Sequence, residues 1–157
     1  MAENLIISDG TKEQKYQTLL QQVITLAEDE SDTIALMANI SSMIHHTFGF
    51  FWTGFYRVSG DELVLGPFQG PLACTRIKFG RGVCGTAWKR AETVIVADVD
   101  KFPGHIACSS ASRSEIVVPV FEDSRVTAVL DIDSDKTDTF DETDKEWLEK
   151  ICGMIAG

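Results

Sequence analysis

The segment "EIVVPVFEDSRVTAVLDIDS", residues 115–134, decides the fold of this 157-residue chain. Two runs rich in β-branched residues, "EIVVPVF" and "VTAVLDID", flank the turn-forming sequence "EDSR", and this pattern predicts a β-hairpin. Asp131 and Asp133 are two residues apart on the second strand. They therefore share one face of the sheet, while their apolar neighbours point to the other face.

The register of this hairpin determines whether Glu115 joins the two aspartates. Pairing that is symmetric about the middle of "EDSR" puts Glu115 opposite residue 132, beside Asp131 and Asp133 but on the other face. One bulged residue would bring all three carboxyl groups to the same face. Crowded carboxylates repel each other and raise at least one pKa, which is typical of a site that binds a cation or transfers a proton. The spacing alone is equally compatible with a solvated strand end.

The sequences on either side of the hairpin predict helices and further strands. Apolar residues have helical spacing from Lys12 to Glu28, and Ser31 or Asp32 can cap a second helix that continues to Thr47. Strands are predicted in "FFWTGFYRV", "LVLGPF", "ACTRIKF" and "TVIVADV", a short helix in "GRGVCGTAWKRAE", and a final helix in "FDETDKEWLEKICGMIAG". This order predicts an α+β fold in which N-terminal and C-terminal helices pack on a central antiparallel sheet. Residues 1–157 are expected to form a single domain.

The overall charge limits the partners of this chain. It has 14 Lys and Arg against 24 Asp and Glu, a formal net charge of -10, which argues against nucleic acid and anionic membranes as partners. No signal-peptide pattern and no membrane-spanning apolar run is found in the sequence, so we expect a cytoplasmic protein. In a reducing compartment, its four cysteines are more often core residues, metal ligands or redox catalysts than structural disulfides.

Three of the cysteines, Cys74, Cys84 and Cys108, lie in the glycine-rich and loop-rich middle of the chain. Cys152 falls on the apolar stripe of the final helix and is expected in the core. Cys108 stands among small polar residues in "GHIACSSASRS", a loop that would present its thiol. Zinc is an alternative, but the sequence has no C-x-x-C pair, and His105 alone is weak support for a ligand set. Redox chemistry fits these thiols better, and no metal is expected.

Two aromatic residues, Trp52 and Tyr56, share one face of the first predicted strand. Aromatic side chains on a central strand usually belong to the core. A wall of a ligand pocket is the alternative interpretation.

Four motifs in register resemble one family. "LVLGPFQGPLAC", "GRGVCGTA", "FPGHIACSSASRSEIVVPV" and "VLDIDS" are similar in order and spacing to the free methionine-(R)-sulfoxide reductases, which are catalytic GAF domains. The resemblance extends from about Phe48 to the final helix. It implies a GAF-like fold and reduction of the free amino acid, R epimer at sulfur, to methionine.

The resemblance also implies a role for each cysteine. Cys108 would be the nucleophile, Cys74 the main resolving thiol, and Cys84 an auxiliary thiol able to exchange disulfides. The resulting disulfide would be reduced by thioredoxin, and no cofactor is implied. One departure is Ser109, because an acid often follows the nucleophile in this family.

The same resemblance implies the substrate-binding residues. Glu115, Asp131 and Asp133 would hold the ammonium group and the sulfoxide of free methionine (R)-sulfoxide. Trp52 and Tyr56 would line the pocket around the thioether end.

Two other functions remain open at this point. A GAF module that binds a small ligand without turnover is the main alternative, although such a sensor needs no resolving thiol. A thiol redox sensor whose disulfide alters an interface is the second. A homodimer is an expectation from the family alone.

Overall fold

A six-stranded antiparallel sheet is the centre of the fold. The computed structural model describes residues 4–105 and 110–155 of the chain. Within them, the helices are α1 (Lys12–Asp29), α2 (Thr33–Phe48), α3 (Gly82–Arg90) and α4 (Glu142–Cys152), with a 3-10 turn, η1 (Val99–Lys101). The strands are β1 (Trp52–Ser59), β2 (Glu62–Gln69), β3 (Arg76–Lys78), β4 (Val94–Val96), β5 (Ser114–Glu122) and β6 (Arg125–Ser134).

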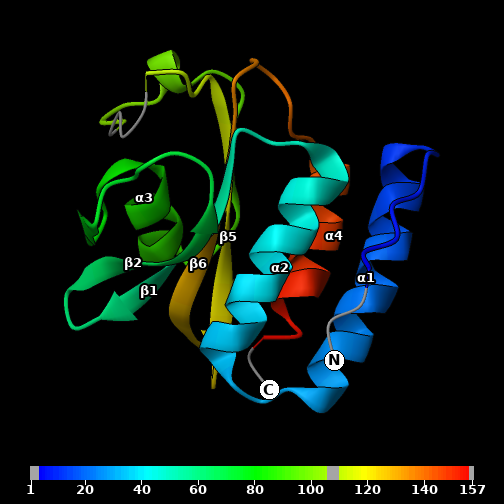
Figure 1. Ribbon diagram of the computed structural model, residues 1–157. Coiled ribbons are helices and arrows are strands. Elements are labelled where there is room, and N and C mark those ends of the chain that lie inside the picture. Colours follow the sequence, from blue (N-terminus) through cyan, green and yellow to red (C-terminus); the bar gives the residue numbers. More distant parts are fainter. Residues whose placement is uncertain (1–3, 106–109, 156–157) are drawn as a thin grey trace.

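The sheet separates the helices into two layers (Figure 1). The strand order is β3-β2-β1-β6-β5-β4. Helices α1, α2 and α4 cover one face, and α3 covers the other together with the long loops. The predicted α+β class, with terminal helices packed on an antiparallel sheet, is confirmed. Within the described residues, no helix is both long and apolar enough to cross a lipid bilayer.

The hairpin of β5 and β6 contains the bulge that the sequence left open. Asp123 and Ser124 form a two-residue turn, both with left-handed backbone φ angles of 51° and 65°. The register then shifts by one residue between Val120 and Phe121, which makes Thr127 the extra residue of β6. As a result Glu115 pairs with Asp133 rather than with residue 132. All three carboxyl groups therefore lie on the α3 face of the sheet.

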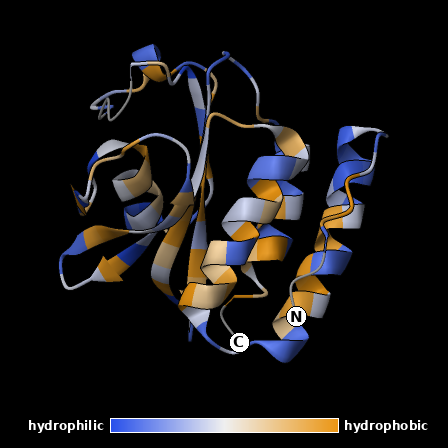
Figure 2. Cartoon of the chain, viewed as in Figure 1, coloured by the Kyte–Doolittle hydropathy of each residue, from blue (hydrophilic) through white to orange (hydrophobic). Residues whose placement is uncertain are grey.

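The larger core lies between the sheet and helices α1, α2 and α4. Figure 2 shows apolar and polar positions alternating along α1 and α2, as expected for helices with one buried stripe. Cys152 of α4 is buried in this core, as predicted. The smaller core lies on the other face, where α3 packs on β5 and β6, and it borders the acidic residues.

A buried polar cluster joins the first and last helices. The Tyr16 hydroxyl of α1 donates to Asp144 Oδ1 of α4 at 2.5 Å, and Lys12 Nζ lies 2.7 Å from Asp144 Oδ2. Asp144 is buried, so its carboxyl depends on these two donors and on the Asp141 N–H, 2.9 Å from Oδ2, for compensation. The cluster fixes α1 against α4 although the two helices are far apart in sequence.

We predict that Tyr16→Phe lowers the free energy of unfolding by about 2 kcal/mol, because a buried carboxylate loses a hydrogen bond. Urea unfolding measures this loss. In an Asp144→Asn background the same substitution should cost much less, since the charged acceptor is already gone. Equal losses in the two backgrounds would mean that the hydroxyl contributes only packing.

Candidate active site

The three acidic side chains of the hairpin form one wall of a pocket beneath α3. Glu115 comes from β5, and Asp131 and Asp133 come from β6. Glu115 and Asp131 are only 5% and 6% exposed. The pocket has a volume of about 50 Å³, several times the roughly 10–15 Å³ that one water needs on such a measure. It is therefore large enough to receive a polar group of a ligand.

Within the described residues, few groups compensate the negative charge of these three carboxyl groups. The Ser112 hydroxyl donates to Asp133 Oδ1 at 3.0 Å, and His105 Nε2 lies 3.7 Å from Glu115 Oε1. Asp131 Oδ1 is buried and has no hydrogen-bond partner in the described part of the chain. A buried acceptor without a donor is unfavourable, so this oxygen is free to bind a ligand.

Burial and mutual repulsion raise the pKa values of all three groups. Burial, followed by the charge of Asp133, raises the pKa of Glu115 to about 8. Burial raises the pKa of Asp131 well above its usual value, and the charge of Glu115 adds to the effect. The pKa of Asp133 is raised for the same reasons, with Asp131 as the neighbour. The cluster therefore holds protons at neutral pH, and it offers both hydrogen-bond donors and negative charge.

Cys84 adds a thiol to this cluster. It lies in the first turn of α3, is buried, and has a free thiol whose sulfur is 4.0 Å from Glu115 Oε2. Burial, then the charges of Asp131 and Glu115, raise the pKa of this thiol well above its usual value. A thiol that stays protonated is a poor nucleophile, so Cys84 does not suit the first attack on a substrate.

The other two cysteines with predicted redox roles are Cys74 and Cys108. Cys74 is half-buried in the loop between β2 and β3, it is disulfide-bonded, and its carbonyl accepts a 2.8 Å hydrogen bond from the Tyr56 hydroxyl. The predicted strand in "ACTRIKF" is shorter than expected and begins at Arg76, which leaves Cys74 outside the sheet. Cys108 lies outside the described residues.

Trp52 and Tyr56 belong both to the smaller core and to the pocket wall. Their rings stack with centroids 6.0 Å apart, and Trp52 also stacks on Phe68 at 5.2 Å. Gly54 stands between the two aromatics in β1, and a Cβ there would lie 2.7 Å from the Trp52 ring. Their packed rings thus belong to the core and also line the pocket; that they bind a ligand stays a prediction.

The structure adds pocket residues that the sequence did not assign to the acidic site. Ser112 and His105 come from an irregular loop, where no periodicity marks a side chain as facing a site. Arg81 and Gly82 come from the start of α3 and also line the pocket. Arg81, at the N-cap, gives no side-chain hydrogen bond to the first turn, so the backbone N–H groups of that turn can bind a ligand.

Comparisons with known proteins agree with this architecture. The sequence pattern of the GAF domain family matches residues 17–156. A Saccharomyces cerevisiae protein, "Free methionine-R-sulfoxide reductase", is 43% identical, with 94% of this chain and 87% of that protein covered. The Escherichia coli protein of the same name is 41% identical, with coverages of 92% and 88%.

A solved structure is also similar. It is the free methionine-R-sulfoxide reductase of Neisseria meningitidis in complex with its substrate, with a TM-score of 0.94 and 52% identity. The match covers 97% of this chain and 92% of that one.

The raised pKa of Glu115 predicts a pH dependence of stability. Its pKa is about 8 in the folded protein against an ordinary 4.5. Its contribution to stability is therefore complete below pH 4.5 and is lost as the pH rises through about 8.

We expect Glu115→Gln to flatten the fall in free energy of unfolding across this interval, as measured by urea unfolding at a series of pH values. Glu122→Gln, at the exposed end of the same strand, should keep the wild-type slope. An unchanged slope in Glu115→Gln would contradict the assignment.

Proposed function

Since the chain belongs to the GAF domain family and, within it, to the free methionine-R-sulfoxide reductases, we propose a thiol-based mechanism for its reaction. The chain is an oxidoreductase of this family. In the proposal it reduces free L-methionine (R)-sulfoxide through a sulfenic acid on Cys108 and a disulfide with Cys74, which thioredoxin reduces. The observation that carries the proposal is the buried, partly protonated carboxyl cluster of Glu115, Asp131 and Asp133.

The carboxyl cluster suits two polar groups of the substrate, the sulfoxide oxygen and the ammonium group. A protonated carboxyl can donate to the sulfoxide oxygen, and an ionised one can bind the ammonium group of a free amino acid. The unpaired Asp131 Oδ1 supplies an acceptor for that ammonium. A methionine sulfoxide residue inside a peptide has no ammonium group. It would leave the buried carboxylate without compensation.

The N-terminus of α3 suits the carboxylate of a free amino acid. Arg81 and the first-turn residues Gly82 and Val83 line the same pocket as the three acids. A helix N-terminus favours a carboxylate through its first backbone N–H groups and the helix dipole. The pocket thus offers opposite charges for the opposite ends of a zwitterion.

The aromatic wall suits the thioether end of the substrate. Trp52 and Tyr56 provide stacked apolar surface beside the acids. Sulfur contacts on aromatic rings are favourable by about 1 kcal/mol. This wall would hold the methyl and methylene groups while the sulfoxide oxygen faces the carboxyls.

The proposed reaction transfers the sulfoxide oxygen to Cys108. The Cys108 thiolate attacks the sulfoxide sulfur, and the oxygen takes a proton from a carboxyl of the cluster. The oxygen is transferred to Cys108, which becomes a sulfenic acid, and methionine leaves. The Cys74 thiol then condenses with the sulfenic acid to give a disulfide and water. A dithiol protein reduces the disulfide by thiol exchange.

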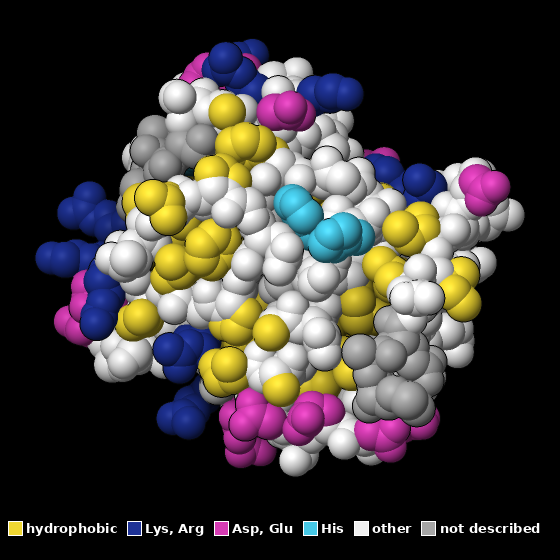
Figure 3. All heavy atoms as spheres, in the orientation of Figure 1, with side chains coloured by type: hydrophobic (Ala, Val, Ile, Leu, Met, Phe, Trp, Pro, Cys, Tyr) yellow, Lys and Arg dark blue, Asp and Glu magenta, His cyan; other side chains and the backbone are white. Residues whose placement is uncertain are grey.

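The charge of the surface near Cys74 favours the binding of a protein reductant. Between residues 63 and 91 the chain has five of its 14 Lys and Arg and none of its 24 Asp and Glu. Figure 3 shows Lys and Arg side chains, with some acidic ones among them, on the side of the molecule where Figure 1 draws α3. A cationic surface on an otherwise acidic protein would attract a partner with an acidic surface.

The proposal predicts selectivity for one epimer of the free amino acid. Protein reduced beforehand should consume NADPH with free methionine (R)-sulfoxide in the presence of thioredoxin and its reductase. It should show little consumption with the S epimer or with a peptide-bound sulfoxide. Binding of the R epimer without any NADPH consumption would instead favour a ligand-sensing module. Cys108→Ser should abolish turnover.

The proposed resolving role of Cys74 predicts a single turnover in its absence. Cys74→Ser should release about one methionine per protein molecule, measured by rapid quench, because the first attack needs only Cys108. Cycling with thioredoxin should then fall at least about tenfold. Cys152→Ser is the matched control, since Cys152 is buried in the other core, and it should cycle normally. Loss of the first methionine release in Cys74→Ser would contradict the resolving role.

A further inference from the structure

The pocket contains a set of atoms that could bind a metal ion, although the proposed reaction requires no metal. One ligand atom each from Cys84, Glu115 and Asp131 lie within 4.8 Å of one another. We infer that these three residues form a binding site for a borderline divalent cation such as Zn²⁺, and that cation and substrate exclude each other. The exclusion, but not the cation site itself, rests on the proposed function.

The geometry is close to that of a tetrahedral site. With Zn–S near 2.3 Å and Zn–O near 2.0 Å, ligand atoms of a tetrahedral zinc are roughly 3.5 Å apart. The Cys84 sulfur and Glu115 Oε2 are 4.0 Å apart, so rotation of side chains alone would close the site. The ligands come from α3, β5 and β6, and packing of α3 on these strands already holds them together.

An independent observation points to a cation at this position. Asp131 Oδ1 is buried and has no partner within the described residues, although its residue is only 6% exposed. Three carboxyl groups and a thiol converge here, and no Lys or Arg side chain is paired with them in the described ion pairs. A cation that displaces the protons would compensate this charge directly.

The type of ligand decides which cation fits. A thiolate with two carboxylates favours Zn²⁺ or Co²⁺ over Mg²⁺ and Ca²⁺, which prefer sites made only of oxygen atoms. His105 lies beside this set, with its Nε2 3.7 Å from Glu115 Oε1, and it is not one of the three residues whose ligand atoms converge. Thiolate and carboxylate are both ligand types that zinc accepts.

Competition follows from the shared carboxyl groups. A cation bound to Glu115 and Asp131 occupies the oxygens that would receive the substrate ammonium and the sulfoxide oxygen. Linkage then requires that each ligand weakens the binding of the other by the same factor. A divalent cation would thus inhibit the reductase and would not act as its cofactor.

Co²⁺ titration of the reduced full-length chain, with a phosphine reductant in place of a competing thiol, tests this site. A near-ultraviolet sulfur-to-cobalt charge-transfer band and strong visible bands of tetrahedral Co²⁺ are expected, and Zn²⁺ should remove them. Cys84→Ser should abolish the charge-transfer band, and Asp131→Asn should weaken Co²⁺ binding at least tenfold. Circular dichroism verifies that both variants are folded.

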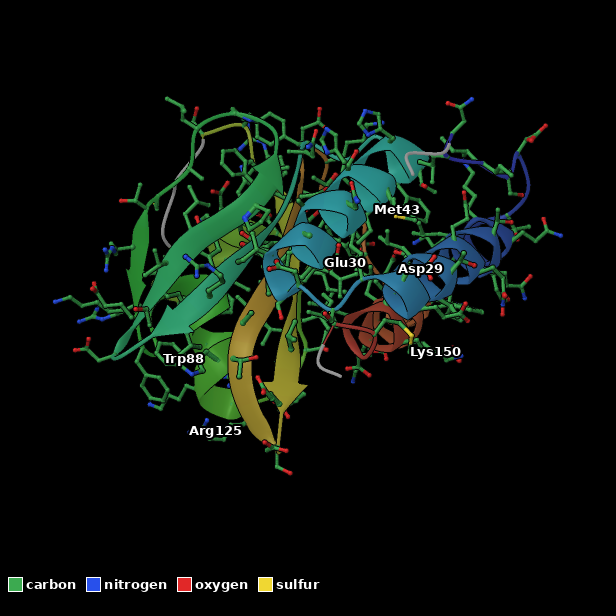
Figure 4. All side chains as sticks on the ribbon, turned by 60° about the horizontal axis from the view of Figure 1, so that its bottom comes forward. Asp29, Glu30, Met43, Trp88, Arg125 and Lys150 are labelled. Carbon is green, nitrogen blue, oxygen red and sulfur yellow. The ribbon has the colours of Figure 1, made fainter. Side chains whose placement is uncertain are left out.

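The remaining cysteines provide the controls. Cys152→Ser should retain the band, since Cys152 lies on α4 in the other core. Figure 4 shows α4, which carries Lys150, and α3, which carries Trp88, on opposite sides of the sheet. Cys74→Ser should also retain the band. A band that survives in Cys84→Ser, or is lost in Cys74→Ser, would overturn the site.

The mutual exclusion of cation and substrate is tested in a separate experiment. Saturating free methionine (R)-sulfoxide should raise the apparent Kd for Co²⁺ at least tenfold. If the protein reduces this substrate but the substrate leaves the cobalt spectrum unchanged, the shared site is wrong. A failed turnover assay would refute the proposed function and leave the cobalt result standing, so the two failures are distinguishable.

Discussion

One extra residue in a β-hairpin determines how the acidic groups of this protein meet. Thr127 is the additional residue of β6, and the register shift beside it pairs Glu115 with Asp133. Without the shift, the carboxyl of Glu115 would point to the apolar core between the sheet and the helices. A bulge of this kind costs one unpaired position in the ladder. The long β5–β6 pairing and the cores on both faces of the sheet keep it in place.

Burial of these acids links the fold to the chemistry. Carboxyl groups in a buried cluster keep protons at neutral pH, so they can act both as donors and as a partial negative charge. The same environment keeps the Cys84 thiol protonated. In the proposed mechanism the nucleophile is therefore a cysteine other than Cys84. The acidic cluster is thus suited to an acid role and not to providing the nucleophile.

The predictable parts of the fold are those with strong periodicity. The helical stripes of α1 and α2 and the alternation of Asp131 and Asp133 follow from residue spacing. The position of Glu115 does not, because no turn residue or pattern near Thr127 marks a bulge. Cys84 is predicted at the glycine-rich start of a short helix, but only the packing of α3 on β5 and β6 shows that its sulfur lies among the carboxyls. His105 and Ser112 belong to an irregular loop, and only tertiary structure brings them to the pocket.

The three buried carboxyl groups are expected to share protons. Carbon-13 NMR of the side-chain carboxyl carbons, recorded as a function of pH, measures this sharing directly. We expect the Glu115 carboxyl to titrate near pH 8 and to do so together with Asp131 and Asp133, with addition of a free amino acid ligand moving the transition to lower pH. Independent titration of all three groups at the ordinary values of exposed acids, near pH 4, would contradict the account.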